Sequence, residues 1–153
     1  MTLPASFPLT MSQIATELGL TLPLSINHAW VIALAGKSAL PVSFSDLLGK
    51  TGRFDGNLTM TANPSDTFTS DPSAPFFGGT FHGMDQANNG NLVASFSGSP
   101  GWSGNISVKN NTTGASGVLS KVDANTWQLL GANPNIVRNR GSQTDSFTIL
   151  PSN

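Results

Sequence analysis

The sequence contains no cysteine and few charged residues. Without cysteine the chain can form no disulfide, no thiolate nucleophile and no cysteine-ligated zinc site. Asp, Glu, Lys and Arg together make up only 10% of its 153 residues, against about 25% in an ordinary globular domain. A charged active site or an ion-pair network is therefore not expected. The polarity of the chain comes from Ser, Thr, Asn and Gly instead.

A basic patch and a long apolar run are also missing. The formal net charge is -1 and the seven Lys and Arg residues are scattered, so nothing indicates a surface for nucleic acid phosphates. No run approaches the 18 or so apolar residues that a membrane-spanning helix needs. The beginning of the chain also lacks the basic and apolar segments of a secretory signal. We therefore expect a protein that folds where it is made, with no nucleic acid or membrane partner.

A short triplet of proline, an apolar residue and Ser or Thr recurs in the first 50 residues: Pro8-Leu9-Thr10, Pro23-Leu24-Ser25 and Pro41-Val42-Ser43. Ser or Thr at a helix N-cap accepts a hydrogen bond from a first-turn amide. Three residues after the caps stand Gln13, His28 and Asp46. Gln13 completes a capping box, Asp46 forms a shorter version, and His28 fits poorly. Each triplet therefore predicts the start of a helix.

Glycines end the three predicted helices at Gly19, Gly36 and Gly49, where a residue without Cβ can adopt the left-handed conformation. Such short helices are marginal in water, so their apolar stripes must pack on one another or on a partner chain. We predict a helical docking module over residues 1–51. The residues expected to mediate docking or assembly are Ile14, Leu18, Ile26, Trp30, Leu34, Phe44 and Leu47.

Beyond Lys50 the helical period disappears, and short β-rich runs alternate with Gly, Asn, Pro and Asp clusters. The expected strands cover residues 57–62, 67–69, 76–82, 92–97, 104–109, 117–121, 126–130 and 146–150. Eight short strands in about 100 residues favour a mostly β fold. We therefore predict an antiparallel β-sandwich, immunoglobulin-like or jelly-roll-like, over residues 52–153.

Residues 11–52 resemble a segment near the start of many tail and other virion proteins of tailed bacteriophages. That segment reads "ELG", then "PLSL" or "PISLND", then "VRALAG", then "ISMSDLYGKS". The counterparts here, in the same order and spacing, are residues 17–19, 23–27, 31–36 and 42–51. This sequence differs at Ile32, where the family often has Arg, and at His28, where an acidic residue is usual.

The resemblance implies a non-enzymatic structural protein of the virion, made in the host cytoplasm. We expect a tail, tail-fibre or adaptor component that docks through its N-terminal helices, with a capsid decoration (cement) protein as the alternative. Its partners would be other virion proteins of the tail or capsid. Low charge and weak short helices also favour a homo-oligomer or repeated copies.

The sequence contains only incomplete matches to motifs for catalysis, cofactor binding and metal binding. The two GK pairs, Gly36-Lys37 and Gly49-Lys50, lack the earlier glycine of a phosphate-binding loop. Ser103 lies in an imperfect nucleophile elbow, and only His28 and His82 could act as its base. Two histidines without cysteine are too few for an expected metal site. We predict no enzyme, no cofactor and no metal, with a wall hydrolase as the weakest alternative.

Aromatic residues leave one further alternative, a carbohydrate-binding module that recognises a host glycan. Phe76, Phe77 and Phe81 are expected in the core of the sandwich. Trp102 lies in an evident Pro- and Gly-rich loop, where an indole ring could stack on a ligand. Trp102 is therefore the residue we expect to contact a ligand, if any does.

Overall fold

The computed structural model describes residues 2–138 and 142–153. Three helices come first: α1 (Met11–Leu18), α2 (Ala29–Leu34) and α3 (Phe44–Leu47). Nine strands follow within the described residues: β1 (Phe54–Ala62), β2 (Asp66–Thr69), β3 (Ala74–Phe76), β4 (Gly79–Ala87), β5 (Leu92–Ser97), β6 (Asn105–Asn110), β7 (Ser116–Lys121), β8 (Thr126–Leu129) and β9 (Gln143–Ser152). The change from helix to strand falls between Leu47 and Phe54, as the sequence texture predicts.

Two of the three predicted helix starts are confirmed. Thr10 caps α1, and its hydroxyl accepts from the Gln13 amide while the Gln13 side chain accepts from the Thr10 amide. Ser43 and Asp46 form the equivalent capping box at α3. The predicted start at Ser25 is wrong, because His28 caps α2 through its ring nitrogen, 3.2 Å from the Trp30 amide. Ser25 caps a turn before the helix instead.

The predicted β-sandwich is wrong, because the strands form a closed antiparallel barrel. The order of hydrogen-bonded neighbours is β2-β1-β9-β6-β7-β8-β5-β4, and β2 pairs with β4 to close the ring of eight strands. Buried and exposed residues alternate along a short strand in the same way in a sandwich and in a barrel. The difference depends on the edge pairing between β2 and β4, which local sequence patterns do not report.

A single predicted strand over residues 76–82 is also wrong, because the chain turns back there. Phe77 and Gly78 connect β3 to β4, and β3 is an extra strand outside the ring. Along one edge of β4, β3 pairs with residues 79–81 and β2 pairs with residues 85–87. The pairing of β4 with β5 is irregular between Phe81 and Gly83. This bulge lies between the two stretches of that edge.

The barrel interior is filled with side chains, as expected when only eight strands close. The largest fully buried residues among those described include Phe76, Phe81, Trp127 and Phe147, and Phe77 is buried beside them, so the prediction that Phe76, Phe77 and Phe81 belong to the core is confirmed. The same hydrophobic core continues into the helices and includes Ile14 and Leu47. The helical segment and the barrel are therefore packed together as one unit.

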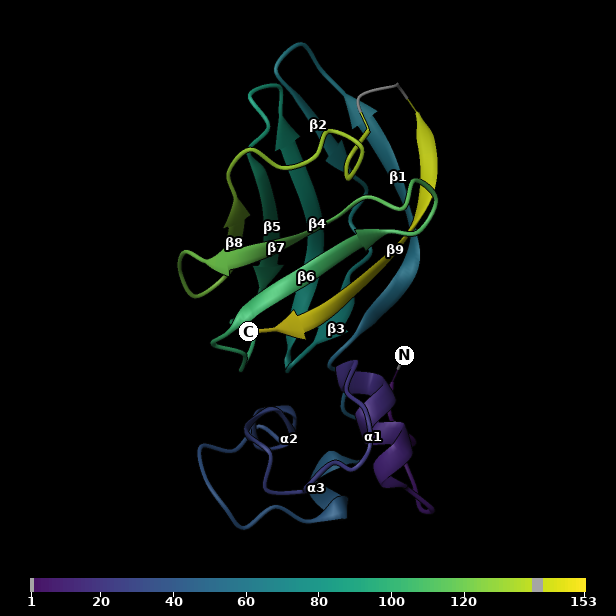
Figure 1. Cartoon of the computed structure of the whole chain (residues 1–153), viewed down its shortest axis with the longest axis vertical. Helices are drawn as coiled ribbons and strands as arrows, with labels where there is room; N and C mark the ends of the chain where they lie inside the picture. The colour runs from purple at the N-terminus through teal and green to yellow at the C-terminus, as the bar shows by residue number, and fades with distance from the viewer. Residues whose placement is uncertain (1, 139–141) are drawn as a thin grey trace.

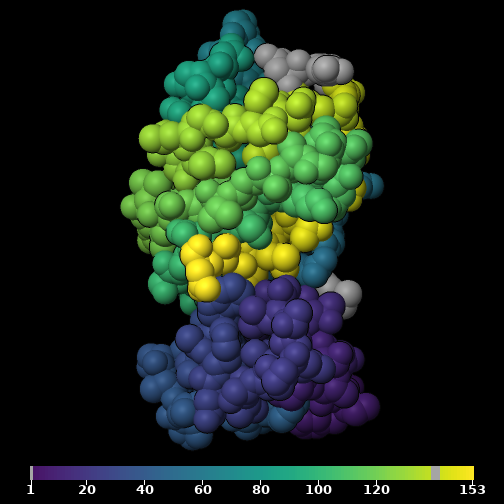
Figure 2. Space-filling view, viewed as in Figure 1, coloured from purple at the N-terminus to yellow at the C-terminus, as the bar shows by residue number. Residues whose placement is uncertain are grey.

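Figure 1 shows the three helices gathered at one end of the barrel, with the C-terminus close to the junction. The space-filling view shows the helical segment, in purple and blue, as a separate layer against that end (Figure 2). Residues 130–138, which follow β8, cross the barrel toward the opposite end (Figure 1). Within the part of the chain that the structure describes, no helix combines the length and apolarity required to cross a membrane.

Gly79→Ala is expected to destabilise the barrel strongly. A Cβ at Gly79 would lie 2.2 Å from the backbone oxygen of Gly98, and Gly79 cannot move away without disturbing β4. We expect a loss of at least about 2 kcal/mol in the free energy of unfolding, measured by urea denaturation. Gly101→Ala is the control, because a Cβ there meets the Phe77 oxygen at 3.4 Å. Equal stability of the two variants would contradict the packing at Gly79.

Candidate functional site

Aromatic rings join the helices to the barrel. The Trp102 ring lies between Trp30 of α2, at a centroid distance of 5.2 Å, and Phe77, at 5.1 Å. Trp102 is only 5% exposed, and its indole nitrogen donates to the Asn105 carbonyl at 2.6 Å. Trp102, which the sequence suggested as a ligand contact, thus packs its ring inside the protein in this structure. The Pro- and Gly-rich loop that suggested exposure folds the ring inward against α2.

Phe77 holds this junction in a constrained backbone conformation. Its φ is 48° and that of Gly78 is 80°, as a two-residue hairpin turn of this hand requires. Positive φ is costly for a bulky residue and persists where surrounding contacts enforce it. The Phe77 amide donates to Thr51 at 2.7 Å, and its carbonyl accepts from Gly101 at 2.8 Å. The turn thus fixes both the linker after α3 and the loop that carries Trp102.

A buried carboxylate reinforces the same junction. One oxygen of Glu17 in α1 accepts from the backbone amides of Gly52 and Arg53, at 2.8 and 3.1 Å. Glu17 is fully buried, and this burial raises the pKa of its carboxyl above the usual value. The Arg53 guanidinium donates back to the Thr16 carbonyl at 3.2 Å. Polar contacts therefore hold α1 at the entry to β1.

The structure places most of the predicted docking residues inside the chain. Ile14, Leu18, Leu34 and Leu47 are 0–2% exposed and belong to the shared core. Ile26, Trp30 and Phe44 are partly buried and pack against it. The stripes thus meet each other and the barrel within one chain, so the four buried residues present no free surface to a partner.

Three large apolar residues of the helical segment do face solvent. Phe7, Leu22 and Leu40 are 60%, 55% and 50% exposed. Each stands directly before the proline of one of the three recurring triplets, so all three repeats place an apolar side chain outward at the same position. We call these three residues the loop triad.

At the opposite end, buried amide side chains hold a loop across the barrel mouth. Gln86 at the end of β4 donates to the carbonyls of Ala132 and Asn133, at 3.3 and 3.2 Å, and accepts from the Val137 amide at 3.0 Å. Gln86 is 5% exposed, and the hydrogen bonds of its side chain fix both ends of the loop. Ile136 and Val137 are buried below it.

Asn110 and Asp145 complete this polar network. The fully buried Asn110 amide donates to the Ile136 carbonyl at 3.0 Å and to the Asp145 carboxylate at 2.6 Å. Arg138 donates from two nitrogens to the same carboxylate. Burial of Asp145 opposes ionisation, but the hydrogen bonds from Arg138 and Asn110 outweigh it and hold its pKa below the usual value. A paired carboxylate thus anchors the segment that follows the loop.

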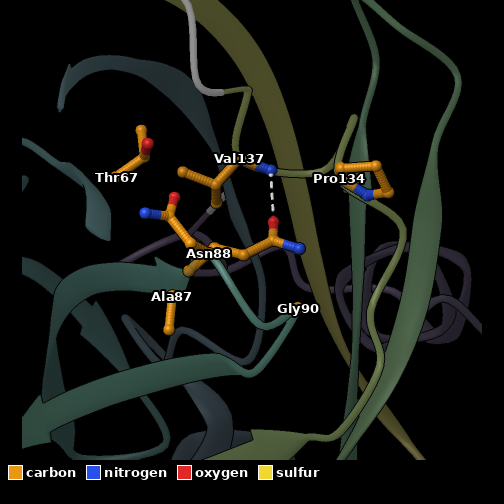
Figure 3. A pocket seen from close by; sticks show the side chains of 7 residues that line it. Thr67, Ala87, Asn88, Gly90, Pro134 and Val137 are labelled. Atoms are coloured by element: carbon orange, nitrogen blue, oxygen red, sulfur yellow. Dashed lines mark hydrogen bonds between the residues drawn. The ribbon is translucent and has the colours of Figure 1, made fainter. Parts of the chain in front are cut away.

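Between the loop and the barrel wall lies a hollow of about 200 Å³. The described residues that line it are Thr67, Gln86, Ala87, Asn88, Gly90, Pro134 and Val137 (Figure 3). Thr67 is 1% exposed, and its hydroxyl has no hydrogen-bond partner within the described part of the chain. An unsatisfied buried hydroxyl costs about 1–3 kcal/mol. This hollow is the candidate ligand site.

The residues considered for catalysis lie elsewhere. His82 Nδ1 is 2.6 Å from the Asp71 carboxylate, and both side chains are nearly half exposed on the barrel wall. His28 caps α2 and packs edge-on against Trp30. Ser103 is exposed in the loop after β5. Across residues 2–138 and 142–153, Ser103 forms no hydrogen bond with either histidine, and there is no group of three or more potential metal ligands.

Sequence reasoning missed the hollow and its network. Thr67, Gln86, Asn110 and Asp145 are widely spaced polar residues in strands that otherwise alternate in the ordinary way. A weak signal was available, because Thr67, Gln86 and Asn110 fall at positions where that alternation places the buried face. Inward amides in a barrel need partners, and here these are in the loop over the mouth.

Comparisons of the chain with protein-family models, with curated proteins and with solved structures found no match.

Replacing Thr67 and Thr69 by valine is expected to change stability in opposite directions. Thr67→Val removes an unpartnered hydroxyl, so the free energy of unfolding should stay constant or rise by up to about 1 kcal/mol. Thr69 accepts from the Met84 amide at 2.8 Å, and Thr69→Val leaves that buried donor unpaired at a cost of about 1–3 kcal/mol. Urea denaturation measures both. A clear loss in Thr67→Val would show that its hydroxyl has a partner in the folded state.

Asp145→Asn is expected to lower the free energy of unfolding by about 1–3 kcal/mol at neutral pH, because it removes the buried carboxylate that accepts hydrogen bonds from Arg138 and Asn110. The folded-state pKa of Asp145 is depressed, so its contribution is present above the unfolded pKa and is lost as pH falls through the folded pKa. Thermal unfolding from pH 7 down to pH 2 should therefore show a flatter acid dependence in the variant.

The control for this titration is Asp123→Asn. Asp123 caps an exposed turn through the Asn125 amide, and an asparagine performs the same role. An acid dependence of Asp145→Asn as steep as that of the wild type would contradict the assigned carboxylate.

Proposed function

We propose that this chain is a non-enzymatic structural protein of a tailed-bacteriophage particle, which docks through its helical segment and holds the barrel outward. The observation that carries the proposal is the loop triad. Phe7, Leu22 and Leu40 expose large apolar side chains at the same position of three repeats. Two of the three repeats, with Leu22 and Leu40, lie within residues 11–52, the part of the chain that resembles virion proteins. A contiguous exposed apolar patch marks an association surface, so docking through the loop triad requires the three side chains to meet one partner together.

The packing of the junction also supports a docking role. Trp30, Trp102 and Phe77 stack across the boundary, and Glu17 bonds to the first residues after the helices. A helical segment fixed in this way transmits its orientation to the barrel. Docking of the loops would therefore set the direction of the whole molecule and not only tether it.

The closed wall of the barrel suits a protein present in many copies. Free strand edges pair readily with other chains, and closure removes them. Pairing of β2 with β4 leaves the ring without an open seam between these two strands. Crowded copies would then associate through their loops and not through strand edges.

Mass spectrometry of purified particles tests the proposal. The particles are those of a bacteriophage whose genome encodes this chain. The chain should be present in them at a constant ratio to the major capsid protein. Cryo-electron microscopy then locates it: density at the tail or its fibres supports an adaptor role, and regular copies over the capsid lattice support a decoration protein. Absence of the chain from purified particles would refute the proposal.

Replacement of the loop triad by serine tests the docking surface itself. The combined variant Phe7→Ser, Leu22→Ser and Leu40→Ser should fold, because the three side chains are exposed, but its incorporation into particles should fall at least about tenfold. The control is Val118→Ser, Val122→Ser and Leu130→Ser, which changes three exposed apolar residues of the barrel. Quantitative mass spectrometry of complemented particles gives the readout. Normal incorporation of the triad variant would contradict docking through these loops.

A further inference from the structure

The three helices of the docking segment begin with caps of different chemistry. Thr10 caps α1 through its hydroxyl, and Ser43 caps α3 together with Asp46. At α2 the cap is His28, whose ring nitrogen Nδ1 accepts from the Trp30 amide at 3.2 Å. Every residue of α2 is described, and its first turn contains no acidic residue. The His28 imidazole is therefore the side chain that satisfies the first turn of α2.

The bond at Nδ1 depends on the charge of the ring. A neutral imidazole has one N–H and one acceptor nitrogen, whereas the protonated ring has an N–H on both nitrogens. Protonation of His28 would turn the acceptor into a donor that faces the Trp30 amide, and would place a positive charge at the positive end of the helix. Histidine ordinarily titrates near pH 6.5. The cap is therefore present at pH 7.5 and is lost as the pH falls to 5.

The caps of the other two helices keep their charge over this range. The hydroxyls of Thr10 and Ser43 do not titrate there. The hydrogen bond from Lys37 lowers the pKa of Asp46 to about 2, so this carboxylate stays ionised at pH 5. Of the three helix starts, only that of α2 depends on a side chain that changes charge between pH 5 and 8.

Charged side chains on the elements around α2 bond to other groups. Glu17 of α1 accepts from the backbone amides after α3, Asp46 of α3 pairs with Lys37, and Lys121 donates to the Trp102 carbonyl. The Lys50 ammonium lies near Gly36, beyond the other end of α2, and the Arg53 guanidinium donates to Asp55 and to the Thr16 carbonyl. Among the described residues, no carboxylate is bonded to the His28 ring. No ion pair would therefore replace the lost cap.

Loss of the cap acts on both sides of His28. Trp30 packs edge-on against the His28 ring, at a centroid distance of 5.8 Å, and against Trp102, at 5.2 Å. On the other side, the His28 amide donates to the Ser25 carbonyl at 3.0 Å, in the loop that carries Leu22. A helix of six residues is marginal without its contacts. The cap therefore supports both the junction with the barrel and one loop of the docking surface.

We propose that His28 is an acid-sensitive switch in the helical segment. The neutral ring closes the first turn of α2, and the protonated ring loosens it together with the loop that carries Leu22. One N-cap changes a folding equilibrium by about fivefold, so the switch changes how often α2 opens and not the fold. Any effect of this opening on docking rests on the proposed function, whereas the opening itself does not.

Nuclear magnetic resonance of the histidine ring nitrogens tests the assigned hydrogen bond in the full chain. At pH 7.5 the ¹⁵N shifts of His28 should show the proton on Nε2 and a bare Nδ1. As the pH falls to 5, the Trp30 amide signal should move with the same midpoint as the His28 ring. A proton on Nδ1 at pH 7.5 would refute the switch, because that nitrogen could not then accept from Trp30.

Amide hydrogen exchange tests the opening of α2. The protection factors of the Trp30 and Ile32 amides, relative to those in His28→Asn, should fall about fivefold between pH 7.5 and pH 5. Asparagine caps a helix through its side-chain oxygen and does not titrate. The matched control is His82→Asn, which removes the other histidine of the chain and should behave as the wild type.

The same pH dependence in the wild type and in His28→Asn would overturn the proposal. It would assign the effect to a group that both proteins retain, such as the buried Glu17 carboxyl, whose pKa is raised by burial. Loss of the pH dependence in His82→Asn would also overturn it. All of these measurements use the isolated full chain, so no outcome bears on incorporation into particles.

Discussion

The backbone groups along one edge of β4 need partners over nine residues, and two different strands provide them. β2 bonds to the end of β4 far from the helices and closes the ring, while β3 bonds to the near end. Neither strand could cover the whole edge, because β2 has four residues and β3 has three. The bulge between Phe81 and Gly83 lies between the two. The turn at the helical end of the barrel and the hollow at the other end both result from this division of the β4 edge between β2 and β3.

At the near end, the division produces the turn on which the helices rest. Because β3 must reverse directly into β4, Phe77 adopts positive φ and its ring is directed against Trp102. Trp102 in turn contacts Trp30 of α2. The helices are too short to be stable alone, so this aromatic contact and the shared core provide the burial that they lack. The loop triad stays exposed, on a segment that is packed against the barrel.

At the far end, the same division forms the walls of the hollow. Pairing of Thr67 with Gln86 places a hydroxyl and an amide side by side on neighbouring strands, facing inward. Gln86 meets its hydrogen-bonding needs in the loop that crosses the mouth, whereas Thr67 finds no partner among the described residues. One end of the barrel is therefore filled by the protein itself, and the other retains a small, uncharged space. The hollow and the proposed docking surface therefore lie at opposite ends of the barrel.

The sequence alone determined what depends on neighbours in the chain. The caps at Thr10 and Ser43, the glycine stops, the change from helix to strand and most strand positions follow from contacts within four residues or from alternation, and these predictions are confirmed. Only the tertiary structure decided the closure of the barrel, the burial of Trp102 and the hollow with its polar network. Each depends on pairs far apart in the chain, such as Gln86 with Val137 or Trp30 with Trp102. Local patterns state which face of a strand is buried, but not which distant group it meets there.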